Sequence, residues 1–155
     1  CQELAYVLQP EETEAPEFLK EALRQGNAVQ DALTDHFKTG RTGNATLKMA
    51  IEASKAAGLR PQIYTHPLGL YGHSAGTTFG MWDAPEGIPG SGEPPLYENT
   101  VYAIELNAKV YLKEWEKDVR IMLEEPGYFG PNGFRYVNGR QTDLILIGKK
   151  SSHLK

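Results

Sequence analysis

The sequence predicts an α+β fold, with two helices near the amino terminus packed on one face of an antiparallel or mixed sheet. In the first third of the chain, apolar residues recur at helical spacing. The second half instead holds short runs rich in β-branched and aromatic residues, which glycine and proline separate. With 155 residues, of which 40% are hydrophobic, the chain has the length and composition of a single domain, residues 1–155, with its own core.

A short strand and two helices are expected first. Leu4–Leu8 is apolar and rich in strand formers. From Pro16 to Lys38 the apolar residues form a helical stripe, and Gly26 on that stripe indicates close packing because glycine otherwise weakens a helix by about 1 kcal/mol. A second helix is expected over Asn44–Ala57, with Thr42 as its amino-terminal cap.

Strands and loops follow. A strand at Pro61–Thr65 places His66 at its end. Thr77–Asp83 is extended, and Ala84–Pro95 forms a loop because glycine and proline dominate it. The remaining expected elements are strands at Thr100–Leu112, Asp118–Leu123 and Thr142–Ile147 and a hairpin within Tyr128–Tyr136.

Composition argues against several classes of partner. The net charge is -4 and no basic stripe is visible, so we expect no nucleic-acid partner. No apolar run is long enough to cross a bilayer, so we expect no membrane partner. The single cysteine, Cys1, leaves no internal disulfide framework and no cysteine-based zinc site.

The segment Ile63–Gly76 carries two of the four histidines, His66 and His73, among small and apolar residues. Glycines and prolines interrupt it repeatedly, so we expect an irregular segment that forms the wall of a pocket. Glycines around His73 would let a small molecule approach the backbone. The alternatives are that His66 is a hydrogen-bonded core residue and that His73 is a loop residue facing solvent.

Glu105 lies in the middle of the strongest predicted strand, where an unpaired carboxylate costs several kcal/mol to bury. We therefore expect it to meet a cation, a hydrogen-bond donor or a metal, the simplest alternative being a salt bridge to Arg120 or Lys109. On the next strand, alternation puts Arg120, Met122 and Glu124 on one face, either towards solvent or towards the pocket of Glu105.

The order of these features resembles the M24 metallopeptidase family, which includes aminopeptidase P, methionine aminopeptidase and creatinase. That family has a His-Gly-Ile-Gly-His-like segment, a downstream histidine, a Thr-Ile-Glu-Pro-like strand and a Val-Arg-Ile-Glu-Asp-like strand. The counterparts here are His66-Pro-Leu-Gly69, His73, Ala103-Ile-Glu-Leu106 and Val119-Arg-Ile-Met122. The resemblance implies the pita-bread fold, a curved sheet with helices on its outer face.

The resemblance also implies a site. In the family, two metal ions held by two aspartates, one histidine and two glutamates activate a water molecule. By matching motifs, His66 and Glu105 would be metal ligands, His73 a catalytic histidine that contacts substrate, and Arg120 a substrate-binding residue. The expected cofactor of the complete protein is a divalent metal such as Mn, Zn or Co.

Two departures from the family pattern affect this site. Met122 occupies the position of the second glutamate, and a thioether is a poor ligand for hard dications. Glu124 lies on the same face and would take that place only through a shift of two residues. The family's aspartates precede the first strand, so we expect an amino-terminally truncated piece, the carboxy-terminal part of a catalytic domain, that holds no metal alone.

Three functions therefore stay open. The first is a metal-dependent hydrolase similar to Xaa-Pro aminopeptidases, with an incomplete metal site. The second is a metal-free hydrolase similar to creatinase, with a histidine as general acid and base. The third is an inactive pita-bread domain that binds peptides or proteins. We expect a peptide or small amide as substrate, leave a homodimer open, and find nothing in the sequence that indicates a cellular compartment.

Overall fold

The computed structural model describes residues 1–148, which form two helices, one 3-10 turn and seven strands. The helices are α1 (Glu17–Thr34) and α2 (Gly43–Ala56), and the turn is η1 (Lys113–Trp115). The strands are β1 (Ala5–Val7), β2 (Pro61–Ile63), β3 (His66–Pro67), β4 (Thr100–Leu112), β5 (Lys117–Gly130), β6 (Gly133–Tyr136) and β7 (Ile145–Ile147).

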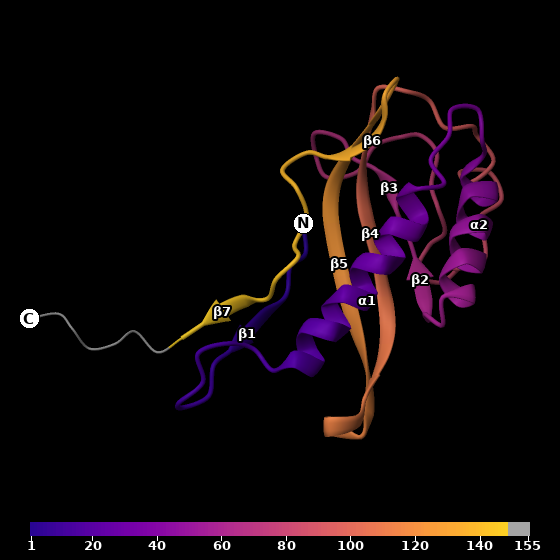
Figure 1. The fold of residues 1–155 in the computed structure, drawn as a ribbon. Helices are drawn as coiled ribbons and strands as arrows, with labels where there is room; N and C mark the ends of the chain where they lie inside the picture. Colours follow the sequence, from indigo (N-terminus) through magenta and orange to yellow (C-terminus); the bar gives the residue numbers. More distant parts are fainter. Residues whose placement is uncertain (149–155) are drawn as a thin grey trace, which may run out of the picture.

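The main sheet is antiparallel and has the strand order β2-β4-β5-β6, with β3 also paired to β4. Strands β4 and β5 form a long hairpin around η1, and they bow along their length in Figure 1. Strands β1 and β7 pair in parallel as a separate small sheet. The expected α+β class, with an antiparallel sheet and two helices, is therefore confirmed.

Both helices lie on one side of the main sheet, and the other side is left for the candidate site. Figure 1 shows α1 lying across β4 and β5, with α2 beyond it next to β2. Alternation along the strands separates the two faces, because successive side chains point to opposite sides. Fully buried apolar residues from α1, α2 and the helix-facing side of the sheet form the core: Leu23, Val29, Leu33, Leu47, Ile104, Leu106 and Leu123.

Gly26 is the point where α1 approaches the sheet most closely. A Cβ atom at this position would lie 2.8 Å from Ile121 Cγ2 and 2.9 Å from Leu123 Cδ1, closer than carbon atoms pack. The glycine on the apolar stripe therefore has the packing role that the sequence indicates. The absence of a side chain lets the helix backbone rest directly on β5.

Two expected boundaries differ from the observed ones by four residues or more. Helix α1 ends at Thr34 and not at Lys38, because Phe37 leaves the helical path and enters the core. There its ring stacks on Phe79 at 5.0 Å between centroids. Strand β5 continues past the expected end at Leu123, because its pairing with β4 runs uninterrupted as far as Gly130.

The amino-terminal segment touches the open edge of β5. Gln2 forms an isolated antiparallel bridge with Glu124, in which each backbone N–H donates to the other residue's carbonyl, at 2.8 and 3.1 Å. The backbone at Glu124 is thus held by β4 on one side and by Gln2 on the other. Neither helix in residues 1–148 has the length and apolarity that crossing a membrane requires.

Candidate functional site

Three side chains with metal-ligand chemistry converge on the face of the sheet opposite the helices. His66 begins β3 and pairs with Ala103 of β4, two residues before Glu105. Glu124 of β5 lies directly opposite Glu105 in the β4–β5 ladder. Opposite residues of an antiparallel pair point to the same face, so the register alone brings the two carboxylates together.

The cluster of His66, Glu105 and Glu124 is compact and half-buried. Each residue offers one ligand atom, and these three atoms lie within 4.8 Å of one another. His66 Nε2 is 3.5 Å from Glu105 Oε2. The side chains are 14%, 28% and 26% exposed, respectively, so the cluster is reachable from solvent without being freely hydrated.

The hydrogen bonding of His66 determines which of its nitrogens faces the cluster. Nδ1 lies 2.9 Å from the Pro67 carbonyl oxygen, which can only accept, so Nδ1 carries the proton of the neutral ring. Nε2 then presents a lone pair towards Glu105. A backbone carbonyl that orients the imidazole in this way is the usual outer partner of a metal-binding histidine.

The electrostatics of the cluster are unfavourable without a proton or cation. Burial raises the pKa of Glu105 and the nearby Glu124 carboxylate raises it further, whereas His66 and His73 lower it. In residues 1–148, no lysine or arginine side chain forms an ion pair with either carboxylate. The exposed amino group of Cys1 lies 3.5 Å from Glu124 Oε2.

The structure contradicts the alternative of a salt bridge from Glu105 to Arg120 or Lys109. Lys109 instead pairs with Asp118 at 3.1 Å. Arg120 lies over the ring of Trp82, with its guanidinium carbon 4.8 Å from the ring centroid. Both cations lie on the β4–β5 ladder at the rung Lys109–Arg120, four residues from the rung that holds the carboxylates, which is too far along the strands to reach them.

The structure also distinguishes Met122 from Glu124. Met122 pairs with Asn107, whereas Glu124 pairs with Glu105. The carboxylate that faces Glu105 is therefore Glu124, and Met122 lies beside it as part of the cavity wall.

His73 lies next to His66. It is exposed, as the solvent-facing alternative predicts, but its ring stacks on that of His66 with 4.1 Å between centroids and 12° between planes. It also lines the same cavity as Glu105. The two histidines of the segment Ile63–Gly76 are thus brought together at one rim of the site.

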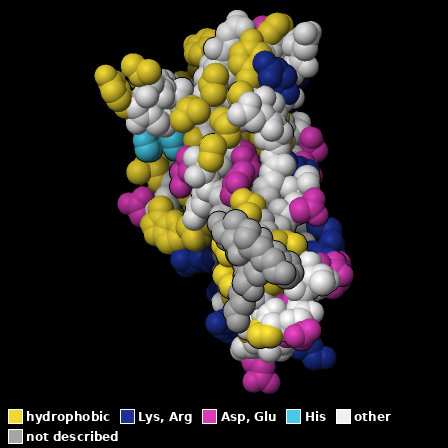
Figure 2. Space-filling model, turned by 90° about the vertical axis from the view of Figure 1, so that its left-hand side faces the viewer, with side chains coloured by type: hydrophobic (Ala, Val, Ile, Leu, Met, Phe, Trp, Pro, Cys, Tyr) yellow, Lys and Arg dark blue, Asp and Glu magenta, His cyan; other side chains and the backbone are white. Residues whose placement is uncertain are grey.

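Sequence reasoning missed the hydrophobic part of the site. The cavity has a volume of about 500 Å³, and its further lining residues are Tyr64, Thr78, Gly80, Met81 and Trp82. Figure 2 shows the histidine side chains next to acidic side chains, with hydrophobic side chains gathered above and below them. The available signal is a tryptophan in an irregular Gly-Met-Trp segment, outside any periodic apolar pattern.

Buried loop residues hold this hydrophobic part in place. Phe79 is fully buried, and its backbone N–H donates to the Thr65 carbonyl at 2.9 Å. Gly80 has φ +71°, and a Cβ atom there would lie 2.3 Å from the Ile63 carbonyl oxygen. The position therefore requires glycine, which lets the loop turn against β2 before Met81 and Trp82.

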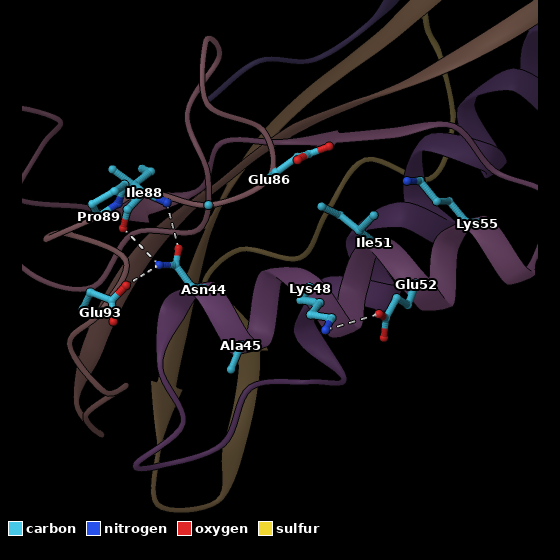
Figure 3. Close-up of a pocket in the computed structure, with 11 residues that line it drawn as sticks. Asn44, Ala45, Lys48, Ile51, Glu52, Lys55, Glu86, Ile88, Pro89 and Glu93 are labelled. Carbon is cyan, nitrogen blue, oxygen red and sulfur yellow. Dashed lines mark hydrogen bonds and ion pairs between the residues drawn. The ribbon is translucent and has the colours of Figure 1, made fainter.

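A larger hollow of about 730 Å³ lies between α2 and the loop after Trp82. Figure 3 shows that the side-chain amide of Asn44 is used within this hollow to hold the loop. Asn44 accepts a hydrogen bond from Ile88 N–H at 2.9 Å and donates to the Ile88 carbonyl and to Glu93 Oε1, both at 3.0 Å. The hollow has no cluster of ligand groups like that around Glu105, so we place the candidate site at the smaller cavity.

The fold is similar to part of several peptidases of known structure. An X-Pro aminopeptidase from Thermotoga maritima matches with a TM-score of 0.59 and 21% identity, over 86% of this chain and 35% of that protein. A dipeptidase from Pyrococcus horikoshii matches with a TM-score of 0.57 and 20% identity, over 85% and 34%. The dipeptidase PepE from Mycobacterium ulcerans matches with a TM-score of 0.57 and 19% identity, over 94% and 34%.

These likenesses establish a fold of the aminopeptidase and dipeptidase kind. The chain spans about a third of the length of the peptidases that it matches. No protein-family model and no curated protein matches the sequence. The likeness therefore supports a peptidase-like fold, and the activity has to be argued from the site.

Proposed function

We propose that the full-length protein is a metal-dependent peptidase, of the aminopeptidase or dipeptidase type, in which His66, Glu105 and Glu124 are metal ligands. One observation carries the proposal: an imidazole nitrogen and two carboxylates face one another, and no lysine or arginine among residues 1–148 forms an ion pair with them. The pita-bread fold and membership of the M24 group belong to the same proposal, supported by the order of motifs and by the likeness to an X-Pro aminopeptidase.

The donor set fits a divalent transition metal. One imidazole nitrogen and two carboxylates suit Mn, Zn or Co, whereas calcium and magnesium prefer oxygen ligands alone. A dication would also offset the burial and the repulsion from Glu124 that raise the pKa of Glu105. Glu124, and not Met122, supplies the second carboxylate, so the departure from the family motif does not remove a ligand from this part of the site.

When bound, such a metal lowers the pKa of a water molecule and polarises a substrate carbonyl. The chain's own residues would hold and orient the reactants. The Pro67 carbonyl fixes the ring of His66, and the β4–β5 register fixes the spacing of the two glutamates. His73, which stacks on His66 and lines the cavity, would contact the peptide, and the hydrophobic wall would exclude water from one side of the cavity.

Thermal unfolding of the full-length protein tests the metal ligands directly. After chelation and dialysis, we expect Mn²⁺ or Co²⁺ at 100 times its dissociation constant to stabilise the protein by about 2.7 kcal/mol. Glu105→Gln and Glu124→Gln should each remove most of that stabilisation. Glu125→Gln is the matched control, because Glu125 neighbours Glu124 on β5 but faces the helices, and it should retain the effect.

The two alternative functions, a metal-free hydrolase and a binding domain, predict different results when metal stabilisation and hydrolysis are both measured. Hydrolysis of a peptide or small amide that survives chelation but is lost in His73→Ala would indicate a metal-free hydrolase. No metal stabilisation and no turnover, with an unchanged circular dichroism spectrum, would contradict both hydrolases and leave a binding domain. Equal metal stabilisation in Glu105→Gln and in the unmodified protein would contradict the proposed ligand set.

A further inference from the structure

One side of the cavity beside the metal-ligand cluster is hydrophobic and contributes no metal ligand. Met81 and Trp82 line it and are each 48% exposed. Tyr64 and Met122 complete this wall, and burial raises the pKa of the Tyr64 hydroxyl, which keeps it neutral. Exposed hydrophobic side chains that gather beside convergent polar groups are typical of a ligand-binding surface.

Trp82 is held in one orientation although half of it is exposed. Its ring packs edge-on against Tyr64, with 5.6 Å between centroids and 75° between planes. The guanidinium of Arg120 covers the ring at 4.8 Å, and Gln62 Nε2 donates to the Trp82 carbonyl at 3.0 Å. An aromatic side chain fixed in this way loses little further entropy when a ligand packs on it.

A polar network on the sheet supports the same wall from behind. Asn107 is buried, and its side-chain amide donates to Gln62 Oε1 at 3.1 Å and to the Tyr64 hydroxyl at 3.3 Å. Residues of β2 and β4, and Tyr64 between β2 and β3, thereby position Trp82. The rigid strands, and not the loop alone, set the shape of the hydrophobic wall.

Met122 makes the cavity wall apolar next to the metal-ligand cluster. It lies two residues before Glu124 on the same face of β5 and is only partly exposed. Arg120, two residues earlier on that face, lies over the Trp82 ring and does not line the cavity. Among residues 1–148, no lysine or arginine lines the cavity next to the cluster.

We propose that Met81, Trp82 and Met122 form a subsite for an apolar side chain, aliphatic or aromatic, of the peptide residue next to the scissile bond. The proposal rests on the peptidase function proposed above. A cavity of about 500 Å³ has room for one such side chain together with the backbone atoms next to it. The subsite discriminates against acidic side chains, which would lose hydration beside Met81, Trp82 and Met122.

Dipeptide hydrolysis by the Mn²⁺-loaded full-length protein tests the preference. We expect kcat/KM for Leu-Ala and Phe-Ala, or for Ala-Leu and Ala-Phe, to exceed that for the corresponding aspartyl peptide. The ratio should be at least about tenfold, because burying a large apolar side chain contributes free energy of that size. Trp82→Ala should reduce the preference, whereas Trp115→Ala, outside the cavity, should leave both the preference and Gly-Ala turnover within about twofold. Met122→Arg should raise the relative turnover of the aspartyl peptide, and Met122→Leu, of similar volume, should preserve the original order.

Binding to the metal-free protein separates this subsite from the peptidase function. Tryptophan fluorescence is titrated with Leu-Ala, Gly-Ala and Asp-Ala, using Trp82→Phe to identify the responding ring and Trp115→Phe as control, since Trp115 packs on Phe18 away from the cavity. Tighter binding of Leu-Ala that requires Trp82 supports the subsite even if no hydrolysis is seen. Hydrolysis with no apolar preference, or with a preference that Trp82→Ala and Met122→Arg leave unchanged, overturns the subsite and leaves the peptidase function standing. Absence of both hydrolysis and selective binding overturns both.

Discussion

Two adjacent glutamates of β5 occupy opposite environments because successive strand residues face opposite sides. Glu124 points to the candidate metal site, whereas Glu125 is 4% exposed and faces the helix side of the sheet. Glu125 Oε1 accepts a hydrogen bond from the Gln141 backbone N–H at 3.0 Å. Burial raises the pKa of Glu125 in spite of that hydrogen bond.

This buried carboxyl makes stability depend on pH. Its pKa is higher in the folded than in the unfolded chain, so the folded state binds the proton more tightly between the two values. The free energy of unfolding should therefore fall as pH rises from about 4.5 through the raised pKa of Glu125. Glu125→Gln should remove part of that fall, as judged by urea unfolding at pH 4 and pH 7.

The exposed Glu52 supplies the control for this comparison. Glu52→Gln lies on the outer side of α2 and should leave the pH dependence unchanged. If the Glu125→Gln protein loses as much stability between pH 4 and pH 7 as the unmodified protein, the buried carboxyl is not the source.

The sequence predicts which residues of β5 share a face, because successive residues alternate. It does not predict which residue of β4 lies opposite each of them. Alternation correctly groups Met122 with Glu124 on one face. Whether Met122 or Glu124 meets Glu105 depends on the length and shape of the turn around η1, which sets the register. If β5 slid by two residues along β4, every side chain would stay on the same face of the sheet. The apolar pattern therefore does not distinguish the two registers.

The packing of α1 on β5 depends on the absence of a side chain at Gly26. Gly26→Ala would gain about 1 kcal/mol of helix propensity, but its methyl group would overlap Ile121 and Leu123. Because overpacking of a tight core costs about 1–3 kcal/mol, we expect a net loss of stability. Thermal or urea unfolding measures it.

A double-mutant cycle identifies the cause of that loss. Ile121→Ala removes one of the two overlapping side chains, so the cost of Gly26→Ala should be smaller in the Ile121→Ala background than in the unmodified protein. Additive costs would show that the two positions do not compete for the same space.

The existence and type of the long elements could be predicted, because each has its own periodicity. Strand β4 has the bounds expected for it, Thr100–Leu112. The end of α1 could not be predicted, since Phe37 continues the helical spacing in sequence and still leaves the helix. It does so because an aromatic cluster with Phe79, Tyr102, Phe129 and Phe134 forms around it. Tertiary packing here overrides the local pattern.

Across the whole molecule, Asn44 connects the start of α2 to a loop more than forty residues later. Its three hydrogen bonds to Ile88 and Glu93 hold that loop over the helix (Figure 3). We expect Asn44→Ala to increase the rate of cleavage after Glu86 or Glu93 by a glutamate-specific protease, because local opening becomes easier. Lys48→Ala, one turn further along α2, should leave the cleavage rate unchanged, and an unchanged rate in Asn44→Ala would show that other contacts hold the loop.

The hydrophobic wall of the site could not be predicted from the sequence. Trp82 reaches the cavity only because Phe79 is buried, Gly80 turns and Gln62 holds the backbone, contacts that are distant in sequence and carry no periodic signal. In contrast, Glu105 stands out in the sequence as a carboxylate in the middle of a strand, and the resemblance to the peptidase family points to His66. The sequence therefore offers candidate residues for the cluster, and it carries no signal for the hydrophobic surface beside them.

The bridge between Gln2 and Glu124 also has a mechanical consequence. Strands β1 and β7 run parallel, so a force that pulls the two ends of the described chain apart loads their hydrogen bonds together in shear and not one after another. The same tension passes through Gln2 to the backbone of Glu124, to which it is bonded in both directions. Tension from the amino-terminal segment thus enters the sheet at the backbone of a residue whose side chain belongs to the candidate metal cluster.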